Sequence, residues 1–162
     1  MAEIRTIAVI GAGALGREIA LAAARAGYRT ILQDILPDRL RSAQAELGES
    51  RSTRLEYAST VEEAARQADL VIEAVPDELE SKLEIFTLLD KVCRPQTILV
   101  SNTSSLSITE IASITYRPQK CIAIKFVNGR AELVRGEQTD QETVKACEEV
   151  IRRIGSSGQK TY

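Results

Sequence analysis

The chain has 162 residues, of which 44% are apolar, so it has room for one domain with a sizeable buried core. Its 21 Lys and Arg residues nearly balance its 23 Asp and Glu residues, which argues against binding to nucleic acid or to an acidic membrane surface. Apolar stretches are interrupted by charges or end within a strand length, so we expect no signal peptide, no membrane span and a cytoplasmic location.

Histidine is absent from the sequence, which excludes histidine-based triads, zinc sites of the His-x-x-Glu-His type and an imidazole general base. Proton chemistry would have to use Lys, Asp, Glu, Tyr or Cys. The three cysteines, Cys93, Cys121 and Cys147, are odd in number and lack the close spacing of a metal site. We therefore expect buried apolar cysteines, no disulfide framework and no metal.

Apolar runs of strand length alternate with segments of helical period, a pattern typical of right-handed βαβ units. The fold class that this predicts is α/β, a Rossmann-like, doubly wound and mostly parallel sheet with helices on both faces. The first strand leads through a Gly-rich turn into a helix that Gly27 can end with a left-handed cap. The expected strands are residues 4–10, 29–33, 55–58, 70–75, 98–101 and 121–126.

Proline and capping boxes indicate where further helices begin. Pro37 suits a first helical turn and predicts a short helix over residues 37–47, followed by a polar loop over residues 48–54. In a capping box, a Ser or Thr and a Glu three residues later exchange hydrogen bonds with the backbone at a helix start. Three pairs have this spacing: Thr60 with Glu63, Ser107 with Glu110, and Thr139 with Glu142.

A dinucleotide-binding fingerprint follows the first strand directly and opens the first helix. Gly11 permits a tight turn, Gly13 lets the backbone approach a pyrophosphate at the positive end of the helix, and Gly16 lets the helix pack close to the sheet. Flavoproteins and some methyltransferases use similar turns, so the loop alone does not identify the ligand. The whole fingerprint is Gly11, Ala12, Gly13, Ala14, Leu15 and Gly16.

Asp34 ends the second expected strand, where a carboxylate can accept hydrogen bonds from both hydroxyls of an adenine ribose. A 2′-phosphate would meet like charge there, and the neighbours Gln33 and Ile35 offer no compensating cation. The sequence therefore predicts NAD rather than NADP as the cofactor. The alternative is a solvated aspartate at the end of a strand.

Three longer segments carry more specific motifs: ADLVIEAVPDELESKLEIF from Ala68, SNTSSLSITEIAS from Ser101 and ELVRGEQTDQETV from Glu132. They resemble the 3-hydroxyacyl-CoA dehydrogenase family, over roughly residues 4–155 of this chain. The resemblance implies an NAD-binding domain. It also implies relatives among 3-hydroxybutyryl-CoA dehydrogenases and the dehydrogenase part of bifunctional fatty-acid oxidation proteins.

The resemblance implies further site residues by motif position. Asp77 and Lys82 fall where the family has an acidic residue and a lysine near the bound NAD, and Ser104 falls on the serine that meets cofactor and substrate. Asn128 matches the asparagine beside the nicotinamide. Asp77 and the polar residues 101–105 also follow strands at their carboxyl ends, where open α/β sheets bind ligands. A solvated helix start is the alternative for Asp77 and Lys82.

The family's general base is a histidine in a His-Phe-Phe-Asn-Pro segment, and the matching segment is Lys125-Phe126-Val127-Asn128-Gly129. Lysine thus stands in the place of the base. Glu132 matches the glutamate that orients the histidine, although the loop over residues 128–132 is shorter than the family's. Alternation along the strand places Lys125 on the side where the family's histidine meets substrate.

Two departures from the family bear on substrate and partners. The connection between Asp34 and Ala68 lacks the longer helical hairpin with which relatives hold coenzyme A. The sequence ends at Tyr162, before the helical domain that completes their acyl pocket and dimerises. We expect one NAD-binding domain over residues 1–162, an acyl-CoA or small hydroxy acid as candidate substrate, and a homodimer or a partner chain that supplies a helical domain.

The sequence is compatible with three hypotheses about function. In the first, the chain is a dehydrogenase of the family's type that uses Lys125 as its base. In the second, it is a binding module that keeps NAD and has lost catalysis. In the third, it is a cofactor subunit whose helical domain comes from a separate chain.

Overall fold

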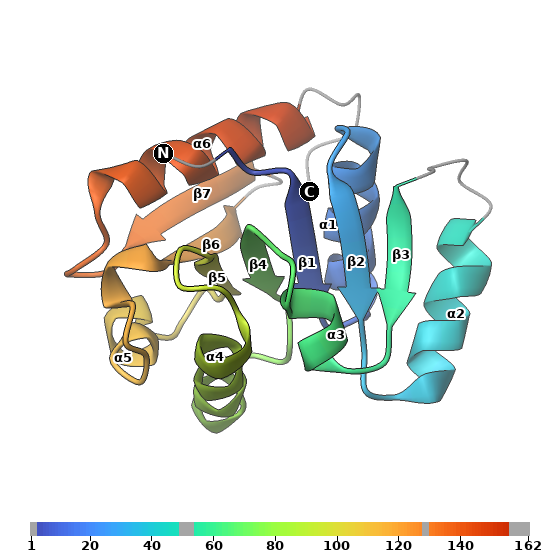
Figure 1. Ribbon diagram of the computed structural model, residues 1–162, viewed down its shortest axis with the longest axis horizontal. Helices are drawn as coiled ribbons and strands as arrows, with labels where there is room; N and C mark the ends of the chain where they lie inside the picture. The colour runs from blue at the N-terminus through green and yellow to red at the C-terminus, as the bar shows by residue number, and fades with distance from the viewer. Residues whose placement is uncertain (1–2, 49–53, 128–129, 156–162) are drawn as a thin grey trace.

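The computed structural model describes residues 3–48, 54–127 and 130–155. Within these ranges, seven strands form one sheet in the order β3-β2-β1-β4-β5-β6-β7, with helices on both faces (Figure 1). Strands β1 to β6 pair in parallel, and β7 is antiparallel to β6. The predicted α/β, Rossmann-like and mostly parallel sheet is confirmed.

Strands and helices alternate along most of the chain. The strands are β1 (Thr6–Ile10), β2 (Arg29–Gln33), β3 (Leu55–Ala58), β4 (Leu70–Glu73), β5 (Ile98–Asn102), β6 (Cys121–Val127) and β7 (Arg130–Arg135). The helices are α1 (Ala14–Arg25), α2 (Pro37–Leu47), α3 (Val61–Ala65), α4 (Leu79–Val92), α5 (Ile108–Ala112), the 3-10 helix η2 (Pro118–Lys120) and α6 (Gln141–Gly155). None of the described helices has the length and apolar character that crossing a bilayer requires.

All six predicted strands form, with ends that differ from the expected bounds by at most two residues, and a seventh strand is added at the edge of the sheet. Strands β2 and β3 and helix α2 have the expected bounds, whereas β1 begins later and β4 ends earlier than expected. Strand β7 lies where the sequence analysis expects a loop up to Glu132, so that expectation is wrong for the described part. The exposed Arg130 and Glu132 alternate with the half-buried Ala131 and Leu133, as suits an edge strand, and no long apolar run reveals it. Residues 49–53 of the expected polar loop lie outside the described residues.

Two of the predicted capping boxes form the hydrogen bond that defines the helix start. The Thr60 hydroxyl accepts a hydrogen bond from the Glu63 N–H at 3.1 Å, and the Ser107 hydroxyl accepts one from the Glu110 N–H at 3.1 Å. Gly27 follows the end of α1 with a φ of 102°, the left-handed conformation that the sequence predicts there. Local sequence therefore determines these helix ends.

The third capping box, Thr139 with Glu142, is a wrong prediction. Helix α6 is capped one residue later by Asp140, whose Oδ1 accepts a hydrogen bond from the Thr143 N–H at 2.8 Å. The buried Thr139 hydroxyl instead donates to the Cys121 carbonyl at 2.6 Å. A tertiary hydrogen bond thus takes the side chain that the local pattern assigns to the cap.

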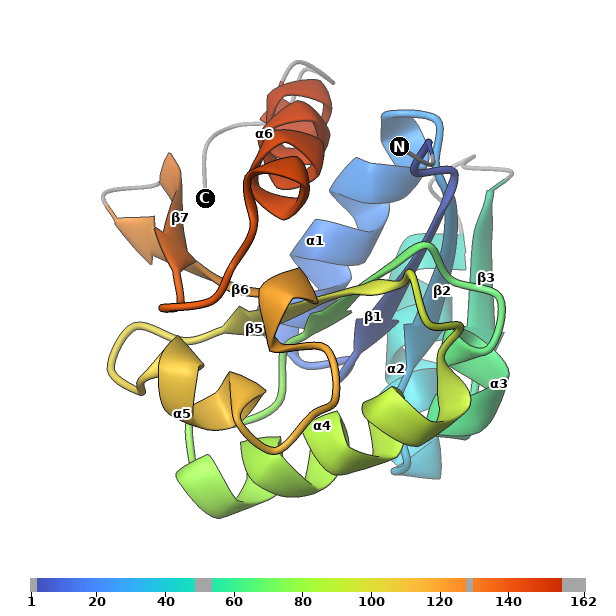
Figure 2. The same cartoon turned by 60° about the vertical axis from the view of Figure 1, so that its left-hand side comes forward.

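The sheet separates two apolar layers, because successive side chains of a strand point to opposite faces. Along β1, Ile7 and Val9 belong to the layer under α1, α2 and α6, whereas Ala8 and Ile10 belong to the layer under α3, α4 and α5. Figure 2 shows α1 and α6 on one side of the sheet and α4 and α5 on the other. This covering of both faces leaves the carboxyl ends of the parallel strands as the accessible edge.

The three cysteines are buried, as the sequence predicts. Burial raises the pKa of the Cys93 and Cys121 thiols to about 11 and that of the Cys147 thiol to about 12. Thiols with such values stay protonated at neutral pH and are poor nucleophiles. The cysteines therefore serve packing.

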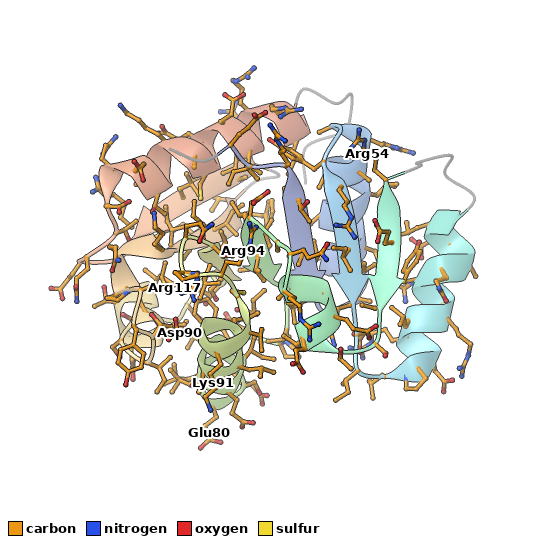
Figure 3. The ribbon with its side chains drawn as sticks, in the orientation of Figure 1. Arg54, Glu80, Asp90, Lys91, Arg94 and Arg117 are labelled. Atoms are coloured by element: carbon orange, nitrogen blue, oxygen red, sulfur yellow. The ribbon has the colours of Figure 1, made fainter. Side chains whose placement is uncertain are left out.

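Arg117 closes the carboxyl end of α4 (Figure 3). The residue is 6% exposed, and its Nε donates a hydrogen bond to Asp90 Oδ1 at 2.8 Å. Its other nitrogens donate to the backbone carbonyls of Asp90, Cys93, Arg94 and Thr97. The last carbonyls of a helix have no partner within the helix, and a cation also suits the negative end of its dipole.

We predict that Arg117→Lys lowers the free energy of unfolding by about 2 to 4 kcal/mol, because one ammonium cannot replace five buried N–H donors. Urea denaturation followed by circular dichroism measures this. The control is Arg152→Lys, since the exposed Arg152 pairs on the surface of α6 with Glu149. Equal stability of the two variants would contradict this role of Arg117.

Candidate functional site

A pocket of about 750 Å³ opens at the carboxyl ends of β1, β2 and β4. Ligands of open α/β sheets bind at this edge, beside the point where the strand order changes direction. In this sheet that point lies between β1 and β4. The glycine loop forms its floor, and segments after β2, β3 and β4 form its walls. Its lining includes Gly11, Gly13, Gly16, Asp34 and Arg39.

The three glycines of the loop meet different surroundings. A Cβ on Gly16 would lie 1.8 Å from the Gly11 carbonyl oxygen, and a Cβ on Gly11, whose φ is 107°, would lie 2.8 Å from the Ala74 carbonyl oxygen. A Cβ on Gly13 would meet nothing within 4 Å. Gly11 and Gly16 are therefore required by close packing, whereas Gly13 borders the open space of the pocket.

The amino end of α1 points its backbone donors at this open space. Gly13 is the N-cap residue, it offers no side chain to cap the helix, and the first turn holds no acidic residue. The Arg17 N–H donates to the Gly13 carbonyl at 3.0 Å, and the N–H groups before it have no partner within the helix. Such a helix end suits a phosphate group.

Asp34 is a buried carboxylate that closes the loop. The residue is 6% exposed, its Oδ2 accepts a hydrogen bond from the Ala12 N–H at 2.9 Å, and its Oδ1 accepts one from the Leu36 N–H at 2.8 Å. The alternative of a solvated strand-end aspartate is therefore wrong. A carboxylate has about four acceptor positions, so Asp34 keeps capacity for two hydroxyl donors.

A cation does lie beside Asp34, contrary to the sequence-based expectation. Arg39 Nη1 lies 3.6 Å from Asp34 Oδ2. The expectation considered only the flanking Gln33 and Ile35, whereas the first turn of α2 brings Arg39 back to the pocket. Sequence reasoning missed this residue because the contact depends on how α2 returns over the loop.

Arg17 is a second missed residue, and it connects the glycine loop to α2. Its Nε donates to the Ala12 carbonyl at 2.8 Å, Nη1 donates to Glu46 at 2.8 Å and Nη2 donates to the Arg39 carbonyl at 3.3 Å. One guanidinium thus holds both the loop and the segment that carries Arg39. The only sequence signal for this role of Arg17 is a long, charged side chain directly after the last glycine of the fingerprint.

Lys82 lies inside the protein, although the sequence also allows a solvated helix start. Its side chain is 0% exposed, and the ammonium donates to Glu73 Oε2 at 2.5 Å, to the Val75 carbonyl at 3.1 Å and to the Asn102 carbonyl at 3.0 Å. The solvated alternative is therefore wrong for Lys82. Its ammonium is thus directed at protein acceptors at the end of β4, just after β4 and at the end of β5.

Glu73 is the carboxylate of this buried network. It also accepts hydrogen bonds from the Ser101 hydroxyl at 2.6 Å and from the Val75 N–H at 2.8 Å. Burial raises the pKa of Glu73, and the neighbouring Lys82 ammonium and these donors oppose that rise. Sequence reasoning did not select Glu73, although a charged residue within an apolar strand was the available signal.

Asp77 and Ser104 come together at the carboxyl ends of β4 and β5. Thr103 donates to Asp77 Oδ1 at 2.6 Å and Ser105 donates to Oδ2 at 2.8 Å, with the exposed Ser104 between them. Burial by itself would raise the pKa of Asp77, but these hydroxyls, the Lys82 ammonium and the Ser104 N–H hold it below its ordinary value. Asp77 is thus an ionised acceptor beside Ser104.

Lys125 and Glu132 lie directly opposite each other in the antiparallel pair β6 and β7. Ile124 and Phe126 contact the apolar layer of α1 and α6, so alternation places Lys125 on the other face, as predicted. The Thr103 N–H donates to the Ile124 carbonyl at 3.1 Å, which brings the Ser104 segment beside this strand. Asn128, expected beside the nicotinamide, lies outside the described residues.

Comparison with known proteins identifies close relatives in sequence. The family model described as "3-hydroxyacyl-CoA dehydrogenase, NAD binding domain" matches residues 6–158. A probable 3-hydroxybutyryl-CoA dehydrogenase of Bacillus subtilis is 38% identical, over 96% of this chain and 61% of that protein. A 3-hydroxybutyryl-CoA dehydrogenase of Bradyrhizobium diazoefficiens is 36% identical, over 95% of this chain and 60% of that protein. The chain thus spans about three fifths of the length of these relatives.

Solved structures agree with the sequence relatives. The (S)-3-hydroxybutyryl-CoA dehydrogenase of Ralstonia eutropha superposes with a TM-score of 0.87 at 28% identity, over 94% of this chain and 62% of that chain. The 3-hydroxybutyryl-CoA dehydrogenase of Escherichia coli gives a TM-score of 0.85 at 34% identity, over 95% of this chain and 37% of that chain. With its cofactor pocket, the chain therefore belongs to the 3-hydroxyacyl-CoA dehydrogenase family, as a member of that family's NAD-binding domain.

Proposed function

We propose that this chain is a cytoplasmic NAD(H)-binding module that has lost efficient oxidation of 3-hydroxyacyl-CoA substrates. The observation that carries the proposal is a contrast between the two halves of the site. The half that would hold the adenosine and pyrophosphate has every group this task needs. The half that would remove a substrate proton has Lys125 opposite Glu132 in place of a neutral imidazole.

The residues of the pocket fit the cofactor group by group. Free N–H groups at the amino end of α1 would bind the pyrophosphate, and the space in front of Gly13 leaves room for it. The remaining acceptor positions of Asp34 would bind the hydroxyls of the adenine ribose. NAD supplies the hydride acceptor for the carbon that bears the substrate hydroxyl. Asp77 and Ser104 would border its nicotinamide half.

Lys82 is better suited to positioning than to direct contact with the cofactor. Its ammonium joins Glu73 to the Val75 and Asn102 carbonyls, so it holds the two strand ends that precede Asp77 and Ser104 at a set separation. The cofactor contact that the family resemblance implies for Lys82 would therefore act through the placement of Asp77, 3.9 Å away.

The proton step argues against strong catalysis. A general base must be unprotonated near the working pH, and an ordinary lysine keeps its proton there. Glu132 lies opposite Lys125 in the β6–β7 pair, where a carboxylate gives a lysine no help as a base. An imidazole in the same place would instead gain a base-orienting partner.

A second candidate function is a cofactor subunit that a separate chain or a second copy completes. Val127 and Val134 are both 37% exposed, and the β-pairing places them on the same face as Lys125. This face would meet the rest of an acyl-binding site, for an acyl-CoA or a small hydroxy acid. Analytical ultracentrifugation of the chain, alone and at high concentration, distinguishes a homodimer from a monomer that needs another chain.

The glycine loop gives the first prediction of this function. Gly13→Val should weaken NAD binding by roughly a hundredfold or more while changing unfolding by less than about 1 kcal/mol, because its side chain fills only the space meant for the pyrophosphate. Gly16→Ala should instead destabilise the fold, because its Cβ meets the Gly11 carbonyl. Calorimetric titration with NAD and urea denaturation measure the two effects.

Gly48→Ala is the matched control for these variants, since a Cβ there also meets nothing within 4 Å but lies outside the pocket. It should leave both NAD affinity and stability close to those of the wild type. A folded Gly13→Val protein that keeps its NAD affinity would place the cofactor elsewhere.

Lys125 gives the second prediction. With NAD and (S)-3-hydroxybutyryl-CoA, NADH formation by the wild type should be barely above background, and Lys125→Ala should not lower it. Lys125→His should raise it at least about tenfold, because an imidazole is a base near neutral pH. The gain should disappear in the double variant Lys125→His with Glu132→Gln, which removes the carboxylate that would orient the ring. Robust wild-type turnover that Lys125→Ala abolishes would instead make Lys125 the base.

A further inference from the structure

We propose that Arg39 is a specificity-determining residue that reduces the chain's discrimination against NADP. It supplies a positive charge at the place where an adenine ribose would carry its 2′-phosphate. The inference rests on the proposed function in one respect, namely that Asp34 binds this ribose.

The pocket holds two opposite charges, Asp34 and Arg39, beside the expected ribose site. Asp34 is buried and held by two backbone N–H groups, so its carboxylate cannot turn away from a ligand. Arg39 Nη1 lies 3.6 Å from that carboxylate, which is an ionic contact longer than a hydrogen bond. At the ribose site the positive charge of Arg39 therefore offsets part of the repulsion that a 2′-phosphate would meet from Asp34.

Arg39 is placed where its side chain can reach a phosphate in the pocket. The side chain is 45% exposed and lines the pocket, so its guanidinium can move the short distance from Asp34 to a phosphate without breaking a buried hydrogen bond. Its backbone is held in the first turn of α2, where its carbonyl accepts a hydrogen bond from Arg17 Nη2. A guanidinium group pairs well with a phosphate, because its N–H donors match two phosphate oxygens at once. The fixed backbone of Arg39 keeps that group beside the open pocket.

The two residues therefore have opposing effects on the choice of cofactor. Asp34 favours NAD, because it accepts from both ribose hydroxyls and repels a phosphate. Arg39 adds little to NAD binding, since NAD has no charge at that hydroxyl, but it attracts the phosphate of NADP. Selectivity for NAD should thus be lower than the Asp34 carboxylate alone would produce.

The test is calorimetric titration of the wild type and of Arg39→Gln with NAD and with NADP. Arg39→Gln should weaken NADP binding about tenfold and leave NAD binding within about twofold, which raises the selectivity for NAD. The matched control is Arg41→Gln, because Arg41 lies on the same helix, is exposed and pairs with Asp38. This control removes the same charge and should leave the NAD to NADP ratio unchanged.

A second pair of variants tests the same residue in the absence of the carboxylate charge. Asp34→Asn should bind NADP more tightly than the wild type does, and adding Arg39→Gln to it should remove that gain. Salt gives an independent readout, because NADP affinity should fall more steeply with ionic strength in the wild type than in Arg39→Gln.

The outcomes separate this inference from the proposed function. If Arg39→Gln weakens NAD and NADP equally, or changes neither, Arg39 does not determine specificity although the cofactor site stands. If the Asp34→Asn gain survives the loss of Arg39, the inference is also overturned. If the wild type binds neither NAD nor NADP, the proposed function itself fails.

Discussion

Helix α1 and its glycine loop pack so closely against the ends of β1 and β4 that only glycine fits at Gly11 and Gly16. The helix passes so near the loop that any Cβ on Gly16 would meet the Gly11 carbonyl, and Gly11 itself is pressed against the backbone after β4. This packing directs the amino end of α1 at the pocket and brings Ala12 within reach of Asp34. The packing of the first helix therefore also sets the geometry of the dinucleotide site.

A second, polar constraint holds the other half of the site. Glu73 and Lys82 form a fully buried ion pair that reaches the backbone after β4 and at the end of β5. Burying such a pair gains little stability over apolar packing, but removing one partner leaves an uncompensated charge. Its value here is geometric, because Asp77 and Ser104 follow the two strand ends that it joins. The glycine loop and the Glu73–Lys82 pair therefore hold different parts of the pocket edge.

Local patterns predicted most of the fold and the cofactor half of the site. The parallel strands, the glycine loop and the helix starts at Thr60 and Ser107 depend on short-range sequence, and the structure has them as expected. The failures involve contacts that form only when separate helices and strands pack together. Strand β7 needs β6 to be recognised, Thr139 turns from its cap to a strand carbonyl, and Arg39 reaches Asp34 only after α2 has folded back. No residue-by-residue pattern contains these tertiary contacts.

We expect NAD to bind at the carboxyl end of this sheet, with its pyrophosphate at α1 and its adenine ribose at Asp34. Titration of the isotopically labelled protein with NAD, followed by amide NMR spectra, tests it most directly, because the backbone N–H groups of Gly13, Ala14 and Leu15 would form the contacts themselves. We expect saturable shifts at these amides and at Leu36, which donates to Asp34. Unchanged signals there, or shifts confined to a surface away from the glycine loop, would contradict it.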